Sequence, residues 1–170
     1  MSKKIMLYLK MSRELHSAAN IAMFCGVLAC VGIISVFQNG GGNATQIIGG
    51  VLLVISSSLI TCGDKCCQCR PIVVLYNVHM LSSVAIACHV LSLILTIVLT
   101  LPWWNQINEW NLGWVNGFIV YGMVIDVLSI LAAFYLIYVV RKEIRAIRTP
   151  EPNPPRRRNV SRQMVRNSAR

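Results

Sequence analysis

Four of the seven cysteines lie within eight positions, in the stretch TCGDKCCQCRP that occupies residues 61–71. They are Cys62, Cys66, Cys67 and Cys69. Thiols at this density can bind zinc, form disulfides or accept acyl chains. Structural zinc sites usually pair two C-x₂₋₄-C knuckles on separate segments, whereas this stretch offers one knuckle and an adjacent cysteine. The spacing therefore disfavours a metal site.

A second set of candidate residues is small or polar and lies inside otherwise apolar sequence. The residues are His79, Ser82, Ala85, His89, Ser92 and Thr96 in one segment, and Gly122, Asp126, Ser129 and Ala133 in another. Members of each set recur at three- and four-residue steps, which in a helix places them on one face. Because lipid-facing positions are apolar, the pattern predicts that these two faces meet.

His89 and Asp126 would lie at similar depths if their segments were antiparallel helices in a membrane. Ionisable groups at mid-membrane cost about 2.5–3.5 kcal/mol on insertion scales and usually find a partner. We therefore predict a hydrogen bond between His89 and Asp126, with His79 on the same stripe. An ion or proton pathway is the alternative interpretation. One acid and two histidines are few ionisable groups for such a pathway. A polar contact that fixes the helix register is therefore favoured.

The elements that position these residues are four long apolar runs, in a chain of 170 residues of which 55% are hydrophobic. The runs cover residues 18–37, 47–62, 72–101 and 114–140. A helix needs about 20 apolar residues to cross a bilayer. Three runs reach that length, and the second spans if it extends through Thr45, Gln46 and Gly63. Since continuous runs lack the alternation of a membrane barrel, we expect an all-α, polytopic bundle of four transmembrane helices.

Basic residues predict the orientation of this bundle. All 16 lysines and arginines precede the first run, separate the second from the third, or follow the fourth. The loops 38–46 and 102–113 contain neither residue type. Because short cytoplasmic loops gather Lys and Arg, both termini and the cysteine stretch are expected in the cytosol, at the plasma membrane or an endomembrane. Cytosolic thiols stay reduced, which favours S-palmitoylation beside Lys65 and Arg70, with inert thiols as a further option.

The two loops on the opposite side carry candidates of their own. Asn43 opens an N-glycosylation sequon with Ala44 and Thr45, although it lies close to the expected membrane edge. Indole rings favour the membrane interface, which predicts an aromatic belt at the second loop. A small surface recognised by a partner is the alternative. The four tryptophans are Trp103, Trp104, Trp110 and Trp114.

Basic segments flank the membrane domain, which is expected to cover residues 18–140. Residues 1–17 are predicted to form a basic leader, either a short helix on the inner leaflet or a frayed chain. Residues 141–170 form a basic tail whose first eight residues continue the last helix until Pro150 stops it. The rest, rich in Pro and Arg, is predicted to be mostly disordered. This tail suits anionic lipid, and its PNPPRR segment matches the ligand pattern of SH3 domains.

Small residues at helical spacing indicate close packing of helices or a homo-oligomer. They are Ala22, Gly26, Gly49, Gly50, Gly113, Gly117 and Gly122.

Catalysis is not predicted, because no paired-carboxylate, Ser/His/Asp or histidine-cysteine constellation is visible in the sequence. No metal, cofactor or nucleic-acid site is expected either. The sequence favours a non-enzymatic tetraspan adaptor that self-associates and partners with other membrane proteins in signalling or trafficking. The alternative is an ion channel or transporter subunit that uses Asp126, His89 and His79.

Residues 21 to about 100 resemble the membrane-spanning four-domains subfamily A, which includes the B-lymphocyte antigen and the high-affinity IgE receptor β chain. The resemblance is carried by a short Gly-rich first loop, by IIGGVLLVISSSLIT in the second run, by a tight second loop and by LYNVHMLSSVAIA in the third run. Ser57 departs from the pattern, where a glycine between serines is usual, as do the cysteine-rich loop and the absence of paired cysteines from the last loop. The resemblance implies tetraspan proteins that assemble with signalling receptors, with cation-channel activity sometimes proposed. No functional residue carries over by motif.

Overall fold

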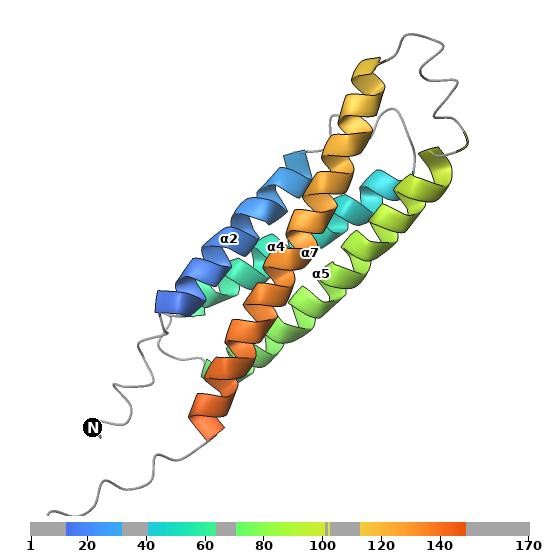
Figure 1. The fold of residues 1–170 in the computed structure, drawn as a ribbon. Helices are drawn as coiled ribbons and strands as arrows, with labels where there is room; N and C mark the ends of the chain where they lie inside the picture. The colour runs from blue at the N-terminus through green and yellow to red at the C-terminus, as the bar shows by residue number, and fades with distance from the viewer. Residues whose placement is uncertain (1–12, 32–40, 64–70, 101, 103–112, 149–170) are drawn as a thin grey trace, which may run out of the picture.

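The computed structural model describes residues 13–31, 41–63, 71–100, 102 and 113–148. These residues form four long helices, α2 (Arg13–Val31), α4 (Gly41–Gly63), α5 (Pro71–Thr100) and α7 (Gly113–Arg148), as Figure 1 shows. Within the described ranges there is no strand. The predicted all-α class is confirmed.

Each of the four helices is long and apolar enough to cross a membrane. The apolar segments are Arg13–Val31, Ala44–Cys62, Ile72–Thr100 and Ile119–Arg148. Their mean hydropathy rises from 1.4 in the first to 2.4 in the last. The fold is therefore that of the expected four-helix, multi-pass membrane protein.

The first two helices begin earlier than the apolar runs suggested. Helix α2 begins at Arg13 rather than at residue 18, since Leu15 is fully buried and Glu14 suits the positive end of the helix dipole. Helix α4 extends through Thr45, Gln46 and Gly63 as predicted, but it begins already at Gly41. Residues 41–46 of the expected loop 38–46 therefore belong to α4 instead.

The start of α5 and the end of α7 both fit local sequence signals. Helix α5 begins at Pro71, a residue favoured in the first turn because its missing N–H is not needed there. Helix α7 ends at Arg148, two residues before Pro150, and it includes the predicted polar extension 141–148. With 36 residues, α7 is about 54 Å long, which exceeds the roughly 30 Å hydrocarbon thickness of a bilayer.

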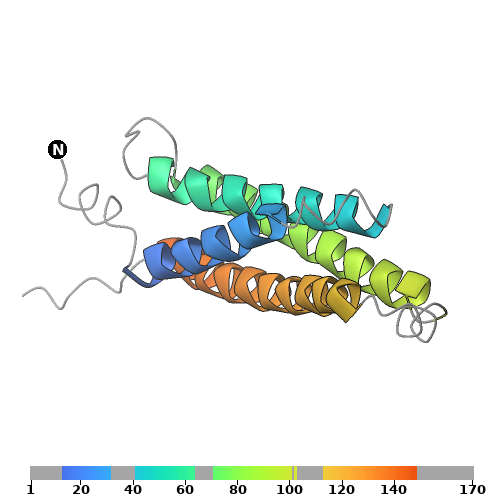
Figure 2. The ribbon, with the colours of Figure 1, turned by 90° about the horizontal axis from the view of Figure 1, so that it is seen from above.

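The helices pack as a ring in which α2 contacts α4, α4 contacts α5, α5 contacts α7 and α7 returns to α2. Figures 1 and 2 show this arrangement from two sides. Helices α4 and α7 lie on a diagonal and touch only slightly. The start of α2, the end of α4, the start of α5 and the end of α7 all lie at one end of the bundle (Figure 1).

The interior of the bundle combines a cluster of aliphatic side chains with many small and polar ones, and large apolar side chains also cover the outer surface. Buried positions of α2 are mainly alanine and glycine, and the serines at 56, 57, 82 and 129 are also buried. Phe24, Met80 and Leu131 are instead between 59% and 65% exposed. Close helix packing through small residues beneath an apolar surface is the pattern expected in lipid, where the hydrophobic effect does not drive helices together.

Candidate functional site

The predicted hydrogen bond between His89 and Asp126 is present. Nδ1 of His89 lies 2.7 Å from Oδ1 of Asp126, between α5 and α7. The side chains are 0% and 2% exposed, so neither reaches the surface of the bundle. A short hydrogen bond between two ionisable groups removes much of the cost of placing them in an apolar interior.

The other edge of the His89 ring lies against the backbone of α4. A Cβ added to Gly49 would lie 2.8 Å from Nε2 and 2.9 Å from Cδ2 of this ring. Gly49 thus makes room for the imidazole because it has no side chain. Among the described residues, Nε2 of His89 has no hydrogen-bond partner. The ring is therefore held by Asp126 on one side and by packing against α4 on the other.

Further polar side chains are buried elsewhere along the bundle, and the two predicted stripes meet only in part. Ser82 of α5 faces α4, where its Oγ lies 3.5 Å from Oγ of Ser56. Ser92 and Ser129 are buried. The stripe on α5 is thus divided between two neighbours, α4 and α7, because a helix in a four-membered ring contacts two others.

Gln46 forms a polar contact across the diagonal of the ring. Its Nε2 donates to the backbone carbonyl of Gly122 over 3.2 Å, which connects α4 to α7. Gln46 is only 5% exposed. Gln46 was not predicted as a site residue, because its partner is a backbone carbonyl that no pattern of side chains identifies.

His79 does not join the central pair. It lies about 15 Å along α5 from His89, by the rise per residue of a helix. There Nε of Arg141 donates to Nε2 of His79 over 2.9 Å. His79 therefore belongs to the basic end of the bundle. The predicted group of three intramembrane polar residues is wrong for His79, which pairs with Arg141 instead.

At this end of the bundle, the extension of α7 makes further polar contacts. Lys142 Nζ lies 2.6 Å from Glu14 Oε2, which joins α7 to α2. Arg148 donates to the hydroxyl of Tyr76 on α5, and its guanidinium lies 5.7 Å from the centre of the same ring. The polar extension of α7 is thus attached to both of its neighbours.

The glycines predicted for packing divide into two groups. Gly26 and Gly50 face each other where α2 crosses α4, since a Cβ on either would lie 2.7 Å from the carbonyl oxygen of the other. Ala22, one turn earlier, is fully buried. Gly122 makes only ordinary contact, 3.8 Å from Oε1 of Gln46, and a Cβ on Gly117 would meet no described atom within 4 Å. Packing of Gly117 inside the bundle is therefore not found.

The lipidation candidates fall at the end of α4. Cys62 is exposed there, and Cys66, Cys67 and Cys69 lie outside the described residues. Among the residues that the structure describes, no cluster of three or more His, Cys, Asp or Glu side chains suited to a metal is present.

The candidates in and beside the two loops without Lys or Arg are only partly described. Asn43 lies in the first turn of α4 rather than in a loop, and Gly113 and Trp114 begin α7. The side chains of Asn43 and Trp114 lie outside the described set, as do residues Trp103, Trp104 and Trp110 entirely. Glycosylation and the aromatic belt remain predictions.

Comparison with protein-family models, with curated proteins and with solved structures finds no match to this chain.

Proposed function

We propose that this protein is a non-enzymatic tetraspan adaptor, which self-associates in the membrane and holds other membrane proteins beside it. The observation that carries the proposal is the enclosure of His89 and Asp126, whose side chains are 0% and 2% exposed. Groups that act on a substrate must reach it, whereas groups that fix helix register do not. An enclosed pair supports a role within the bundle.

The outer surface supports the same proposal, because it is left for contacts within the plane of the membrane. Large apolar side chains project from all four helices, including Phe24, Ile48, Met80 and Leu131. Such surfaces can pack against lipid or against the helices of another membrane protein.

The remaining features of the proposal concern the ends of the helices. Sixteen one-sided basic residues favour a cytosolic position for the end at which α2 begins and α7 ends. Acyl chains on Cys66, Cys67 or Cys69 would then anchor the loop between α4 and α5 to the inner leaflet. The resemblance to the membrane-spanning four-domains subfamily A, together with an adaptor role in signalling or trafficking, agrees with this arrangement.

A second candidate function is that of an ion channel or transporter subunit. One observation favours it: among the described residues, Nε2 of His89 and the hydroxyls of Ser57 and Ser129 are buried without a hydrogen-bond partner. Buried polar atoms of this kind can take up water or an ion when a bundle opens. The close approach of Gly49 to the His89 ring argues against a path there.

Two measurements on the full chain separate these functions. The first is energy transfer between donor- and acceptor-labelled copies in liposomes, at increasing lipid dilution. The adaptor proposal expects transfer above the random level that persists on dilution. The second is ion flux into the same liposomes, compared with the double variant His89→Gln/Asp126→Asn. Flux that the double variant abolishes, without persistent energy transfer, would replace the adaptor with the channel.

A further inference from the structure

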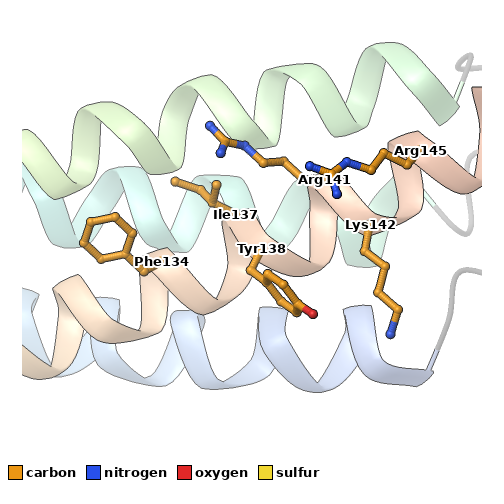
Figure 3. Close-up of a pocket in the computed structure, with 6 residues that line it drawn as sticks. All are labelled: Phe134, Ile137, Tyr138, Arg141, Lys142 and Arg145. Atoms are coloured by element: carbon orange, nitrogen blue, oxygen red, sulfur yellow. The ribbon is translucent and has the colours of Figure 1, made fainter.

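An open pocket lies on the outer face of α7, near the end of the bundle where the basic residues gather. Its volume is about 360 Å³, within the range of small-molecule sites. Figure 3 shows the six residues that line it, Phe134, Ile137, Tyr138, Arg141, Lys142 and Arg145. The lining changes along the helix from apolar and aromatic to cationic. One end of the pocket therefore suits an apolar group and the other an anion.

The depth of this change matches the layers of a bilayer. Asp126 lies near the middle of the apolar run 114–140, and Arg141 lies about 22 Å farther along the helix axis. Headgroups begin about 15 Å from the midplane and end near 22 Å. Phe134, about 12 Å from Asp126 by the same measure, stays in the hydrocarbon. Arg141 is therefore at the outer edge of the headgroup layer. Lys142 and Arg145, about 24 and 29 Å from Asp126, reach back toward that layer because helical side chains lean toward the N-terminus of their helix. The apolar part of the pocket is level with acyl chains.

Neighbouring helices hold two of the cations in place. The Nε–H of Arg141 donates to His79 of α5, which leaves the guanidinium fixed beside the pocket. Lys142 is held on the opposite side by Glu14 of α2, at 2.6 Å. In Figure 3 Arg141 and Arg145 lie toward α5, whereas Lys142 and Tyr138 lie toward α2. Positive charge thus flanks the depression on both sides.

We propose that this pocket binds one anionic glycerophospholipid, whose phosphate lies among Arg141, Lys142 and Arg145 and whose acyl chain lies along Ile137 and Phe134. The three cations outnumber the two carboxylates near Lys142, those of Glu14 and Glu143, so the site keeps a net positive charge that an anionic headgroup complements. Basic pockets of membrane proteins at headgroup depth recognise lipids in this way.

A lipid is the occupant that fits both parts of the pocket. Phe134 and Tyr138 are 56% and 63% exposed on the surface that faces the bilayer, so an acyl chain reaches the pocket without leaving lipid. A soluble phosphate would use the cations alone. The inference depends only on a chain that crosses a membrane, and it would survive failure of the adaptor proposal.

Native mass spectrometry of the purified full chain tests the proposal. The probes are phosphatidylserine, phosphatidylglycerol and phosphatidylcholine with identical acyl chains. The wild type is expected to retain one anionic lipid in preference to phosphatidylcholine. Arg141→Gln/Arg145→Gln should weaken that binding by about 25-fold, the loss expected for two basic residues near a membrane surface. The matched control Arg13→Gln/Arg148→Gln removes the same charge at the same end of the bundle, outside the pocket, and should keep the preference.

A charge-preserving variant and a soluble competitor provide further tests of the proposal. Arg141→Lys/Arg145→Lys keeps the charge and should retain most of the lipid binding. This result would show that the Gln variant binds less because it lacks the charge and not because it is misfolded. Soluble glycerophosphate at equal concentration should not displace the lipid, and displacement would show that the acyl chain is not part of the site. Equal weakening in the pocket and control variants would overturn the proposal, as would equal binding of the three lipids.

Discussion

Gly49 faces the imidazole of His89 across the interface of α4 and α5, so closely that a Cβ on residue 49 would lie 2.8 Å from Nε2. The same ring is hydrogen-bonded through Nδ1 to Asp126 of α7. His89 therefore cannot move away from α4 without pressing against Asp126, to which its Nδ1 already lies only 2.7 Å away. The space that Gly49 leaves on α4 thus allows His89 of α5 to contact Asp126 of α7.

Gly49→Ala is expected to destabilise the bundle by about 1–3 kcal/mol, as other over-packed interiors do. The added methyl collides with a ring that the Asp126 bond holds in place. The free energy of unfolding in a detergent titration measures the effect. Gly117→Ala is the matched control, since a Cβ there meets no described atom within 4 Å and alanine favours a helix over glycine. Equal loss in both variants would contradict the role given to Gly49.

Gly26→Ala and Gly50→Ala are each expected to separate α2 from α4. Each new Cβ would lie 2.7 Å from a backbone carbonyl oxygen of the facing helix, and a backbone cannot yield as a flexible side chain does. The loss should equal or exceed that of Gly49→Ala. The thermal midpoint of the detergent-solubilised chain, followed by size-exclusion chromatography, reports it. Midpoints that match Gly122→Ala, whose Cβ makes only ordinary contact, would refute this close crossing.

Asp126→Leu and His89→Leu are expected to be less costly together than the sum of the single changes. Either single substitution leaves a buried polar group without its partner, whereas the double substitution removes both. The coupling free energy from a double-mutant cycle should be about 1–2 kcal/mol, at the upper end of polar contacts measured in membrane bundles. Strictly additive losses would mean that the 2.7 Å contact contributes nothing to stability.

The triple variant Cys66→Ser/Cys67→Ser/Cys69→Ser is expected to lose a hydroxylamine-sensitive acyl-exchange signal. Thioesters form on cysteines beside the cytosolic membrane edge, and these three follow the end of α4. Cys88→Ser provides the control, because Cys88 lies inside α5 and should carry no lipid. A signal that survives in the triple variant would exclude acylation of these three cysteines.

The sequence predicted the helices and the central pair because both leave strong patterns. Long apolar runs have no other stable form in lipid, and His89 and Asp126 stood alone as ionisable groups at matching depth. Adjacent glycines were harder to interpret. Gly49 and Gly50 look alike in sequence, yet one faces His89 of α5 and the other faces Gly26 of α2, since successive helical residues point about 100° apart.

The contacts at the basic end of the bundle could not be predicted in the same way. His79 shares a stripe with His89, but α7 continues beyond its apolar run and brings Arg141 to it. That contact depends on how far α7 extends past its neighbours, which periodicity within one helix does not encode. The pocket on α7 was not predicted for the same reason, because its cations are positioned by Glu14 and His79 on other helices.

The order in which a ribosome delivers the helices gives the central contact a role in biogenesis. Helix α5 emerges before α7, so the imidazole enters the bilayer before its acid does. A mean hydropathy of 2.3 lets α5 accept that single polar group. Asp126 then arrives beside a hydrogen-bond partner that is already in the bilayer, whereas in a chain that lacks His89 its carboxyl group would enter the lipid unpaired.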